Sequence, residues 1–391
     1  TRCAEGDAMI RKFTTVYPGH VDLPDMGQEA TPANERRFSN EHLASVFEKT
    51  EAIAKKLDEI GFDTLWLAEH HFQHEGYEVI PNILMLAVHL AHTTKRLRTG
   101  CGFNIAPMWH PLRLAEDFAV ADILTKGRTV FGVGRGYHTR EVETFGAPMQ
   151  DANANRELFE EQVEIIFKAF NQESFSHKGK HYTLPPRVPY RGYELKEITL
   201  VPRPINRPVE CWQPIVSANP RGLDFMIRHG IKGMVGGGAA TMAEGPIHGY
   251  RDAAARAGQE LELGENLGIG IFFYLSESRE KAIREMTPFY EEHVKMFAPL
   301  GFVPGITPPQ VAAVAKRGNW SAAGVPTVEH YMKTGAWFAG TAQELIDHLK
   351  TIERRYPGMQ HINLSTSLGT PKAVMLEQFQ RVGEEVMPAF R

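Results

Sequence analysis

The stretch Gly61-Phe62-Asp63-Thr64-Leu65-Trp66-Leu67-Ala68-Glu69-His70-His71-Phe72 begins as an apolar strand and ends in an acid and two imidazoles. Leu65–Leu67 has no polar alternation, which is typical of a strand covered on both faces, as in parallel sheets. Polar residues that follow such a strand lie at its carboxyl end, where α/β proteins place their chemistry. The stretch therefore predicts an α/β fold and marks Glu69, His70 and His71 as candidate functional residues.

Seven further strand candidates alternate with helical segments along the chain. Residues 40–60, for example, carry apolar side chains at a spacing near 3.6, and Ser39 or Asn40 can cap this helix. Eight β–α units indicate a parallel sheet, which would close into a (β/α)8 TIM barrel; an open doubly wound sheet is the alternative that periodicity does not exclude. The expected strands are Phe13–Tyr17, Phe62–Leu67, Leu97–Ile105, Thr129–Gly134, Trp212–Ser217, Ile231–Val235, Leu267–Leu275 and His361–Ser365.

The segments between these strands predict the helices of the barrel. Pro81 lies near the start of the second of them, where proline is favoured. The expected helices are Asn40–Ile60, Pro81–Leu90, Leu112–Leu124, Glu157–Phe170, Gly222–His229, Thr241–Ala257, Arg279–Phe297, Ala342–Arg355 and Pro371–Met387.

Three segments rich in proline exceed a minimal barrel: residues 18–38, 172–210 and 300–334. None resembles a domain linker, because β–α units resume after each one. Long insertions in such connections are often lids or covers of a site. We therefore expect a single α/β domain over residues 1–391, a TIM barrel with three insertions.

Composition excludes several classes of function. The 391 residues are 42% hydrophobic and 23% charged with a net charge of −4, so no basic surface for nucleic acid or anionic lipid is expected. No apolar run is long enough to span a membrane, and residues 1–10 carry no apolar signal core. The three scattered cysteines are typical of reduced thiols, which favours a cytoplasmic protein.

The cluster Glu69, His70, His71, His74 and Glu75 has three interpretations. Imidazoles and carboxylates suit zinc or iron, but adjacent histidines on a loop are an unusual ligand set. A plain polar end to a strand is the second interpretation. The third is a flavin site, which the rest of the chain favours.

Glycines and polar residues lie at the ends of two other expected strands and inside a third. Gly134-Arg135-Gly136 follows Thr129–Gly134: glycines let a phosphate approach backbone N–H groups, and arginine binds it bidentately, although a solvated surface arginine is the ordinary reading. Ser217-Ala218-Asn219 precedes a helix, whose N-terminus can bind phosphate or simply be capped. Glycine in Gly100-Cys101-Gly102-Phe103-Asn104 lets a planar ligand lie close, and Asn104 can hydrogen-bond a ring edge.

Taken together, these stretches resemble the bacterial luciferase-like flavin monooxygenases, and the luciferase α subunit in particular. The resemblance rests on "GFDTLWLAEHHF", "HPLRLAEDFAVAD", "KGRTVFGVGRGY", "FGAPM" and "VMPAF", which occur in the family's order over most of the chain. It implies a TIM barrel that binds reduced FMN at the carboxyl ends of its strands. It also implies a flavin C4a-peroxide, formed with O2, that oxygenates a second substrate.

The resemblance assigns roles to individual residues. His70 matches the catalytic histidine of the family, and Arg135 matches the arginine that holds the flavin phosphate. Gly102 and Phe103 lie where the family has a non-proline cis peptide beneath the flavin. The expected cofactor-binding residues are Glu69, Gly102, Phe103, Asn104, Arg135, Gly136, Ser217, Ala218 and Asn219, and no metal is expected.

The favoured function is a two-component monooxygenase that receives FMNH2 from a separate flavin reductase, since no dinucleotide fingerprint is present. The alternatives are a deazaflavin-dependent dehydrogenase of the same superfamily, a non-catalytic flavin-binding protein and a metal hydrolase on the same barrel. Residues 300–334 are the lid candidate, and a homodimer is implied by resemblance. An aldehyde, ketone or other small hydrophobic substrate would fit if Phe13, Phe72, Phe103, Trp109, Tyr137 and Trp337 lined an apolar pocket.

Overall fold

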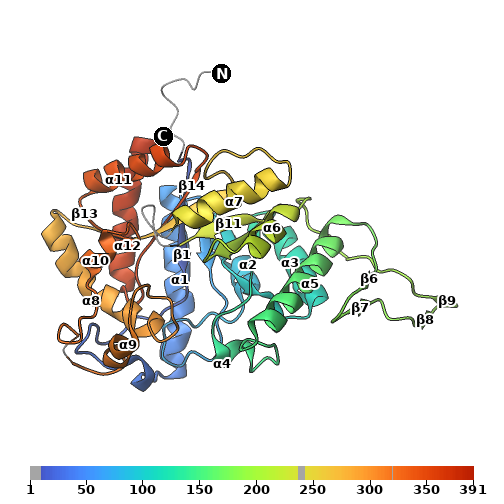
Figure 1. The fold of residues 1–391 in the computed structure, drawn as a ribbon, viewed down its shortest axis with the longest axis horizontal. Coiled ribbons are helices and arrows are strands. Elements are labelled where there is room, and N and C mark those ends of the chain that lie inside the picture. The colour runs from blue at the N-terminus through green and yellow to red at the C-terminus, as the bar shows by residue number, and fades with distance from the viewer. Residues whose placement is uncertain (1–9, 237–242, 319) are drawn as a thin grey trace.

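The computed structural model describes residues 10–236, 243–318 and 320–391. Within these residues, eight parallel strands form a closed barrel in the order β10-β11-β12-β14-β1-β2-β3-β5, and β5 pairs back with β10 (Figure 1). The TIM barrel is therefore confirmed, and the open sheet is wrong. The barrel strands are β1 (Lys12–Tyr17), β2 (Thr64–Leu67), β3 (Arg98–Cys101), β5 (Thr129–Gly134), β10 (Cys211–Ile215), β11 (Lys232–Val235), β12 (Leu267–Leu275) and β14 (His361–Ser365).

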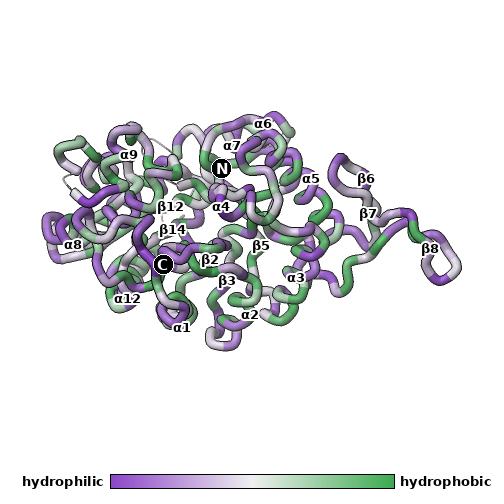
Figure 2. Tube along the Cα trace, turned by 90° about the horizontal axis from the view of Figure 1, so that it is seen from below, coloured by the Kyte–Doolittle hydropathy of each residue, from purple (hydrophilic) through white to green (hydrophobic). Residues whose placement is uncertain are grey.

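Helices surround the barrel (Figure 1), and hydrophobic and hydrophilic residues are interleaved along them (Figure 2). In α1, the Ser39 side chain accepts from the backbone N–H of His42, and the helix ends at Gly61, whose φ of 90° leads into β2. The other helices are α2 (Ile83–Thr93), α3 (Pro111–Leu124), α4 (Thr139–Val142), α5 (Ala152–Asn171), α6 (Pro220–Arg228), α7 (Glu244–Arg256), α8 (Arg279–Phe297), α9 (Pro308–Val314), α10 (Val328–Met332), α11 (Ala342–Arg355) and α12 (Lys372–Arg381), with α1 spanning Asn40–Ile60.

The interior of the barrel is filled by side chains, so it is a core and not a channel. Trp66, Val130, Trp212 and Met234 form a buried cluster there, with Phe103 packed against it. A larger cluster lies between the strands and the helix ring. Burial of a large apolar side chain contributes roughly 2–3 kcal/mol, and these two layers hold the strand ends in fixed positions.

The structure differs from the expected elements in several places, and α4, α9 and α10 were not among the expected helices. The expected strand Leu97–Ile105 is two strands, β3 and β4 (Asn104–Ile105), because the chain turns at a cis peptide between Gly102 and Phe103. Strand β13 (Trp337–Gly340) was not expected; it pairs with the end of the nine-residue β12 beyond the part that pairs with β14. The last helix ends at Arg381 and continues as a π-helix over Val382–Val386. Residues 241 and 242, where a helix start was expected, lie outside the described residues.

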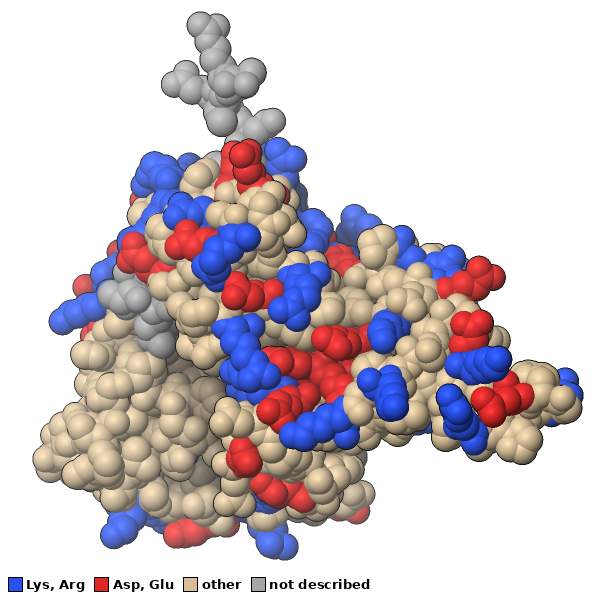
Figure 3. Space-filling model, turned by 45° about the vertical axis from the view of Figure 1, so that its right-hand side comes forward, with Lys and Arg blue, Asp and Glu red and all other residues tan. Residues whose placement is uncertain are grey.

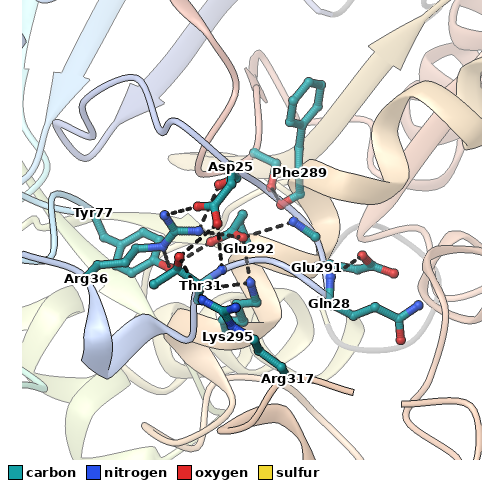
Figure 4. A network of polar contacts seen from close by, with 12 residues as sticks. Asp25, Gln28, Thr31, Arg36, Tyr77, Phe289, Glu291, Glu292, Lys295 and Arg317 are labelled. Carbon is teal, nitrogen blue, oxygen red and sulfur yellow. Dashed lines mark hydrogen bonds and ion pairs between the residues drawn. The ribbon is translucent and has the colours of Figure 1, made fainter. Parts of the chain in front are cut away.

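The insertion of residues 18–38 is held against α8 by buried ion pairs (Figure 4). Arg36 lies 2.8 Å from Asp25 and 3.1 Å from Glu292, and the Arg36 and Glu292 side chains are 1% and 0% exposed. Lys295 and the Tyr77 hydroxyl also donate to Glu292, at 2.8 and 2.7 Å. A carboxylate with this many donors ties the loop after β1 to the helix that leads into the third insertion.

The other two insertions of the barrel are the arm and the lid segment. Residues 172–210, here called the arm, extend beyond the helix ring as two short hairpins. These hairpins pair β6 (His177–Lys178) with β7 (Thr183–Leu184), and β8 (Pro189–Tyr190) with β9 (Tyr193–Glu194). Residues 298–336, here called the lid segment, carry α9 and α10, and Trp320, Val325 and Tyr331 of this segment share a buried apolar cluster with α8 and β13.

Candidate active site

The predicted site residues follow strands that are neighbours in the barrel. His70 follows β2, the cis peptide follows β3, Arg135 follows β5 and Ser217 follows β10. Because these strands are parallel and adjacent, their carboxyl ends meet at one edge of the barrel. The structure therefore brings the separate sequence clusters to a single end of the molecule.

His70 is buried among acids and aromatic residues. Its ring is 3% exposed, and Nδ1 lies 3.3 Å from both carboxylate oxygens of Glu141 on α4. On the opposite ring edge, Nε2 lies 3.1 Å from the hydroxyl of Tyr137 and 3.4 Å from Glu78. His138 Nε2 lies 2.9 Å from the other oxygen of Glu78. We call His70, Glu78, Tyr137, His138 and Glu141 the His70 cluster.

The charges of this cluster shift two pKa values in opposite directions. Burial favours neutral forms, but Glu78 and Glu141 outweigh it and raise the pKa of His70 above its ordinary value. Burial also opposes ionisation of Glu141, yet the hydrogen bond and charge of His70 lower the pKa of this carboxyl to about 2. The opposed shifts describe a mutually stabilised ion pair between His70 and Glu141.

Two polar residues support Glu141 from behind. Gln73 donates to Glu141 at 3.0 Å, and Arg140 donates to Gln73 at 2.8 Å while pairing with Glu75. Glu75 and Gln73 come from the loop that follows His71. Glu75, one of the acids of the cluster considered for a metal, therefore faces an arginine.

Glu69, an expected cofactor-binding residue, forms its hydrogen bonds with the protein itself. Its carboxylate accepts from the backbone N–H of Ile105 at 2.7 Å and from the indole of Trp109 at 2.8 Å, and His71 lies 3.1 Å away. The side chain is 1% exposed. In the structure Glu69 thus anchors the segment after the cis peptide, and its contact with a cofactor stays a prediction.

The cis peptide between Gly102 and Phe103 lies where the resemblance implied one. Phe103 packs on the aromatic cluster inside the barrel, and Asn104 donates to the carbonyl of Gly132 at 3.0 Å. Within the described residues, the buried Oδ1 of Asn104 has no hydrogen-bond partner. A buried orphaned acceptor is costly unless a ligand or water satisfies it, so Asn104 fits a ligand with a donor group.

The region around Arg135, predicted to bind the cofactor phosphate, contains a second arginine that the sequence did not indicate. Arg156 on α5 lies near enough to Arg135 for their like charges to lower the pKa of Arg135, after burial as the largest cause. Glu160 is engaged by Arg221 at 2.7 Å. Among the described residues neither Arg135 nor Arg156 forms an ion pair, so this cationic pair favours an anion.

The start of α6 lies beside this pair. A methyl group on Gly222, in the first turn of α6, would be 3.3 Å from Nη1 of Arg156. Asn219 caps the helix by accepting from Gly222 N at 3.1 Å, and Ser217 and Ala218 are exposed ahead of it. Gly136, with φ of 82°, continues the turn after Arg135. Asn219 therefore caps the helix, as expected of an ordinary helix N-terminus. Because an arginine lies beside it, the same helix end is also suited to an anion.

The expected aromatic pocket is only partly assembled. Phe13 packs in the core against Phe62 and Phe390, and Phe72 lies on the surface against Phe145. The expectation for these two residues is wrong, whereas for Trp109, which donates to Glu69, it stays a prediction. Aromatic spacing in a sequence does not distinguish core from cavity.

Other aromatic rings connect the His70 cluster to the lid segment. Tyr137 contacts Phe302 of the lid segment with ring centroids 4.9 Å apart, and Phe297 lies 4.5 Å from His293. His293 in turn contacts Phe272 and Trp337. The lid segment, expected from the sequence as residues 300–334, therefore reaches the site through Phe302.

Two imidazoles and a carboxylate of the His70 cluster could in principle hold a metal ion. The ligand atoms of His70, Glu78 and His138 lie within 4.8 Å of one another. However, the Tyr137 hydroxyl hydrogen-bonds two of them, 2.8 Å from Glu78 and 3.1 Å from His70. An ion would have to displace this hydroxyl and break the direct contacts, so the arrangement is that of a hydrogen-bonded cluster.

Residues 27–359 match the family described as luciferase-like monooxygenase, and the chain belongs to that family. The oxygenase component of a flavin-dependent trigonelline monooxygenase from Acinetobacter baylyi is 24% identical over 91% of this chain and 93% of its own. The alkanal monooxygenase alpha chain of Photorhabdus laumondii is 35% identical over 32% of this chain and 35% of its own. The resemblance inferred from the sequence is therefore confirmed.

Other similarities are partial or concern the fold. An uncharacterised protein, y4vJ of Sinorhizobium fredii, is 32% identical, but the match spans 39% of this chain and 42% of that protein. The structure of monooxygenase RslO1 from Streptomyces bottropensis is similar with a TM-score of 0.71, 21% identity and coverage of 97% and 100%. The oxygenating constituent of 3,6-diketocamphane monooxygenase from Pseudomonas putida, solved with FMN, has a TM-score of 0.69, 17% identity and coverage of 97% and 98%.

The same fold also serves a different flavin-type cofactor. An F420-dependent secondary alcohol dehydrogenase has a TM-score of 0.63 at 16% identity, with coverage of 98% and 99%. The fold therefore does not decide between the two cofactors. Separately, no described helix is both long and apolar enough to cross a bilayer. On the face drawn in Figure 3, positive and negative side chains are intermixed, and neither sign forms a continuous field.

Proposed function

We propose that this chain is the oxygenase component of a two-component flavin monooxygenase, which uses reduced FMN and O2 to oxygenate a small hydrophobic substrate. The observation that carries the proposal is the pairing of two features at one end of the barrel. One is the cationic seat of Arg135 and Arg156, and the other is the buried His70 cluster. An anion seat suits a cofactor phosphate, and a titratable imidazole suits proton transfer near neutral pH.

FMN fits the residues that line this end of the barrel. Arg135, Arg156 and the N-terminus of α6 would hold the phosphate, because an anion there would neutralise two like charges. Asn104 would meet the flavin ring, since its buried Oδ1 lacks a partner within the described residues. Gly102, Phe103, Gly136, Ser217, Ala218 and Asn219 remain in the proposed cofactor site. Bound reduced FMN would supply the electrons that activate O2.

His70 is the proposed catalytic residue, and its surroundings support a role in proton transfer. The ring is sheltered from solvent, so proton movement at His70 depends on its own partners and not on bulk water. Phe302 and Tyr137 bring the lid segment over the cluster. Closing the lid segment would exclude the water that turns reduced flavin and O2 into hydrogen peroxide without product.

A separate reductase is proposed as the source of reduced FMN. The glycines after β5 do not form a dinucleotide fingerprint, because Tyr137 occupies the last glycine position of such a frame. The name of the Acinetobacter relative, an oxygenase component, supports the same division of labour. We also propose a homodimer, supported by apolar side chains exposed on α1–α3, including Phe47 and Met85. A cytoplasmic location is proposed as well, supported by the free cysteines Cys101 and Cys211.

The proposed substrate is small and hydrophobic, such as an aldehyde or ketone. Tyr137, Phe297, Phe302 and His293 give the lid side of the site an aromatic surface. Burial lowers the pKa of His293 to about 3, so this imidazole is neutral at ordinary pH and suits an uncharged ligand. The relatives named for trigonelline and alkanals act on different molecules, so the class is argued from this surface alone.

An F420-dependent dehydrogenase is the second candidate, favoured by the similar fold of the F420-dependent alcohol dehydrogenase. A deazaflavin would transfer a hydride and leave O2 untouched. The arginine pair would bind either phosphate, whereas a need to shelter reduced flavin from water is specific to the oxygenase. Cofactor binding and oxygen uptake distinguish the two.

The test mixes anaerobic protein with FMNH2 and then adds oxygenated buffer in a stopped-flow spectrometer. We expect the absorbance of oxidised FMN to return later than it does with free FMNH2, and the delay to shorten in His70→Asn. Return at the free-flavin rate, together with tight binding of F420, would overturn the proposal in favour of the dehydrogenase. Asp117→Asn, on the exposed side of α3, is the matched control.

A further inference from the structure

Both ring nitrogens of His70 have acidic partners, and these come from different elements. Glu141 on α4 faces Nδ1, with both oxygens at 3.3 Å. Tyr137, in the loop after β5, lies 3.1 Å from Nε2, and Glu78, in the loop before α2, lies beside the Tyr137 hydroxyl at 3.4 Å from the same nitrogen. The sequence motif that indicated His70 contains neither Glu78 nor Glu141.

Counting hydrogens assigns the protonation of the ring. The Tyr137 hydroxyl donates its only hydrogen to Glu78 at 2.8 Å, which is shorter than its 3.1 Å distance to His70. A carboxylate is also the stronger acceptor. The phenol oxygen can then only accept from His70, so Nε2 carries a hydrogen. Nδ1 faces carboxylate oxygens that only accept, and it carries a hydrogen as well.

We propose that Glu78, acting both directly and through the Tyr137 hydroxyl, is a positioning residue that works with Glu141 to keep both ring nitrogens of His70 protonated. His70 can then donate a proton but has no lone pair with which to accept one. The inference deepens the proposed function and rests on it for the role of His70. It also sets the direction of proton transfer, which identification of the histidine alone does not.

The surroundings of His70 support this state on every side. The ionisable groups that face it are Glu69 from its own segment, Glu78, Glu141, Tyr137 and His138. Burial alone would favour neutral imidazole, but the carboxylates raise the pKa of His70 above its ordinary 6.5. Burial and Glu78 raise the pKa of Tyr137 well above its ordinary value, so the phenol keeps its hydrogen at neutral pH.

The experiment observes the ring nitrogens directly by NMR in protein labelled with ¹⁵N-histidine. His70→Asn identifies the signals of His70 among the 17 histidines. At pH 7.5 we expect both nitrogens of His70 to carry hydrogens. In Glu78→Gln the midpoint of the His70 titration should fall by about one pH unit, which corresponds to about 1.4 kcal/mol, and Glu78→Asp should restore part of the shift.

Two further variants keep the test informative. Tyr137→Phe removes the hydroxyl without touching an acid and should lower the His70 midpoint in the same direction, even if Glu78→Gln does not fold. Glu51→Gln is the matched control, because it disrupts an exposed glutamate–histidine pair with His89 far from the cluster and should leave His70 unchanged.

The outcomes separate this inference from the proposed function. A singly protonated His70 in the unaltered protein at pH 7, or a midpoint that does not move in Glu78→Gln and Tyr137→Phe, overturns the inference. His70 can prove doubly protonated while the His70→Asn variant delays FMNH2 oxidation as much as the unaltered protein does. That combination supports the inference and overturns the catalytic role of His70. Loss of product formation at high pH, with its midpoint lowered in Glu78→Gln, supports both.

Discussion

At the residue scale, Arg156 illustrates a functional side chain that is visible only in three dimensions. It lies on a regular helix, α5, twenty-one residues after Arg135, and nothing in its neighbourhood in the sequence distinguishes it from a surface arginine. Its proximity to Arg135 without an ion pair, within the described residues, is what indicates an anion site.

We expect Arg156→Ala to weaken FMN binding by about 10- to 100-fold, since a charge-assisted hydrogen bond contributes roughly 1.5–3 kcal/mol. Riboflavin, which has no phosphate, should bind equally to both proteins. Fluorescence quenching of the two flavins measures this. Arg221→Ala is the control, because Arg221 is already paired with Glu160; an equal loss of riboflavin affinity in Arg156→Ala would contradict a phosphate role.

The ion pair of His70 and Glu141 predicts a pH-dependent stability. Glu141, with its pKa lowered to about 2, stabilises the fold above its ordinary 4.5, and this contribution is lost as pH falls towards 2. His70, with its pKa raised, stabilises the fold below its ordinary 6.5, and this contribution is lost as pH rises through the folded pKa. Both contributions are therefore present between about pH 4.5 and 6.5.

Glu141→Gln should reduce the free energy of unfolding by about 3 kcal/mol in that window, because it removes one of the two carboxylates that pair with a buried charge. Urea unfolding across the pH range measures the difference, which should shrink below pH 4. The exposed pair of Asp117 and Arg113 provides the control Asp117→Asn, expected to cost under about 1 kcal/mol. A difference that does not vary with pH would contradict the ion pair.

At the scale of elements, α8 connects the site to the two loops that cover it. Glu292 on α8 forms ion pairs with Arg36 and Lys295, and the C-terminal end of α8 leads into the lid segment. Trp320 of the lid segment donates its backbone N–H to Gln28 in the same insertion after β1. The lid segment is thus held by the apolar cluster it shares with α8 and β13 and by the loop that α8 anchors.

Glu292→Gln should lower the free energy of unfolding by about 3–5 kcal/mol, since two buried cations would lose their shared carboxylate. Thermal and urea unfolding measure the effect. Glu277→Gln, an exposed acid that pairs with Lys281 at the start of the same helix, should cost less than about 1 kcal/mol. Similar costs for the two variants would mean that the network in Figure 4 does not anchor α8.

At the scale of the whole molecule, the outer faces of α1–α3 expose several large apolar side chains. Met85 is 73% exposed and Phe47 43%, on neighbouring helices. Light scattering should detect a dimer, and Met85→Asp should shift it towards monomer. Val201→Asp, at an equally exposed site of 74% on the arm, is the control. A monomer in the unaltered protein would overturn the proposed homodimer.

The barrel could be predicted from the sequence because most of its strands are short apolar runs and the helices between them, such as α1 and α11, carry an apolar period and local caps. The expected range for α1 matches the structure because Ser39 and Gly61 supply local signals at both ends. Strand β13 was missed because it is short and is defined by pairing with β12, a contact between distant segments. The aromatic pocket was partly wrong because Phe13 and Phe72 fit either a core or a surface.

The sequence by itself determined the eight β–α units, the family, the position of His70 and the arginine after β5, because these depend on local patterns that neighbouring residues carry. Only the tertiary structure decided the closure of the barrel, the partners of His70 and the pairing of Arg135 with Arg156. Glu78, Glu141 and Arg156 lie 8 to 86 residues from His70 along the chain. They share one end of the barrel because parallel strands bring their carboxyl ends together, and the charge state of a buried side chain is set by whatever the fold places within a few ångströms.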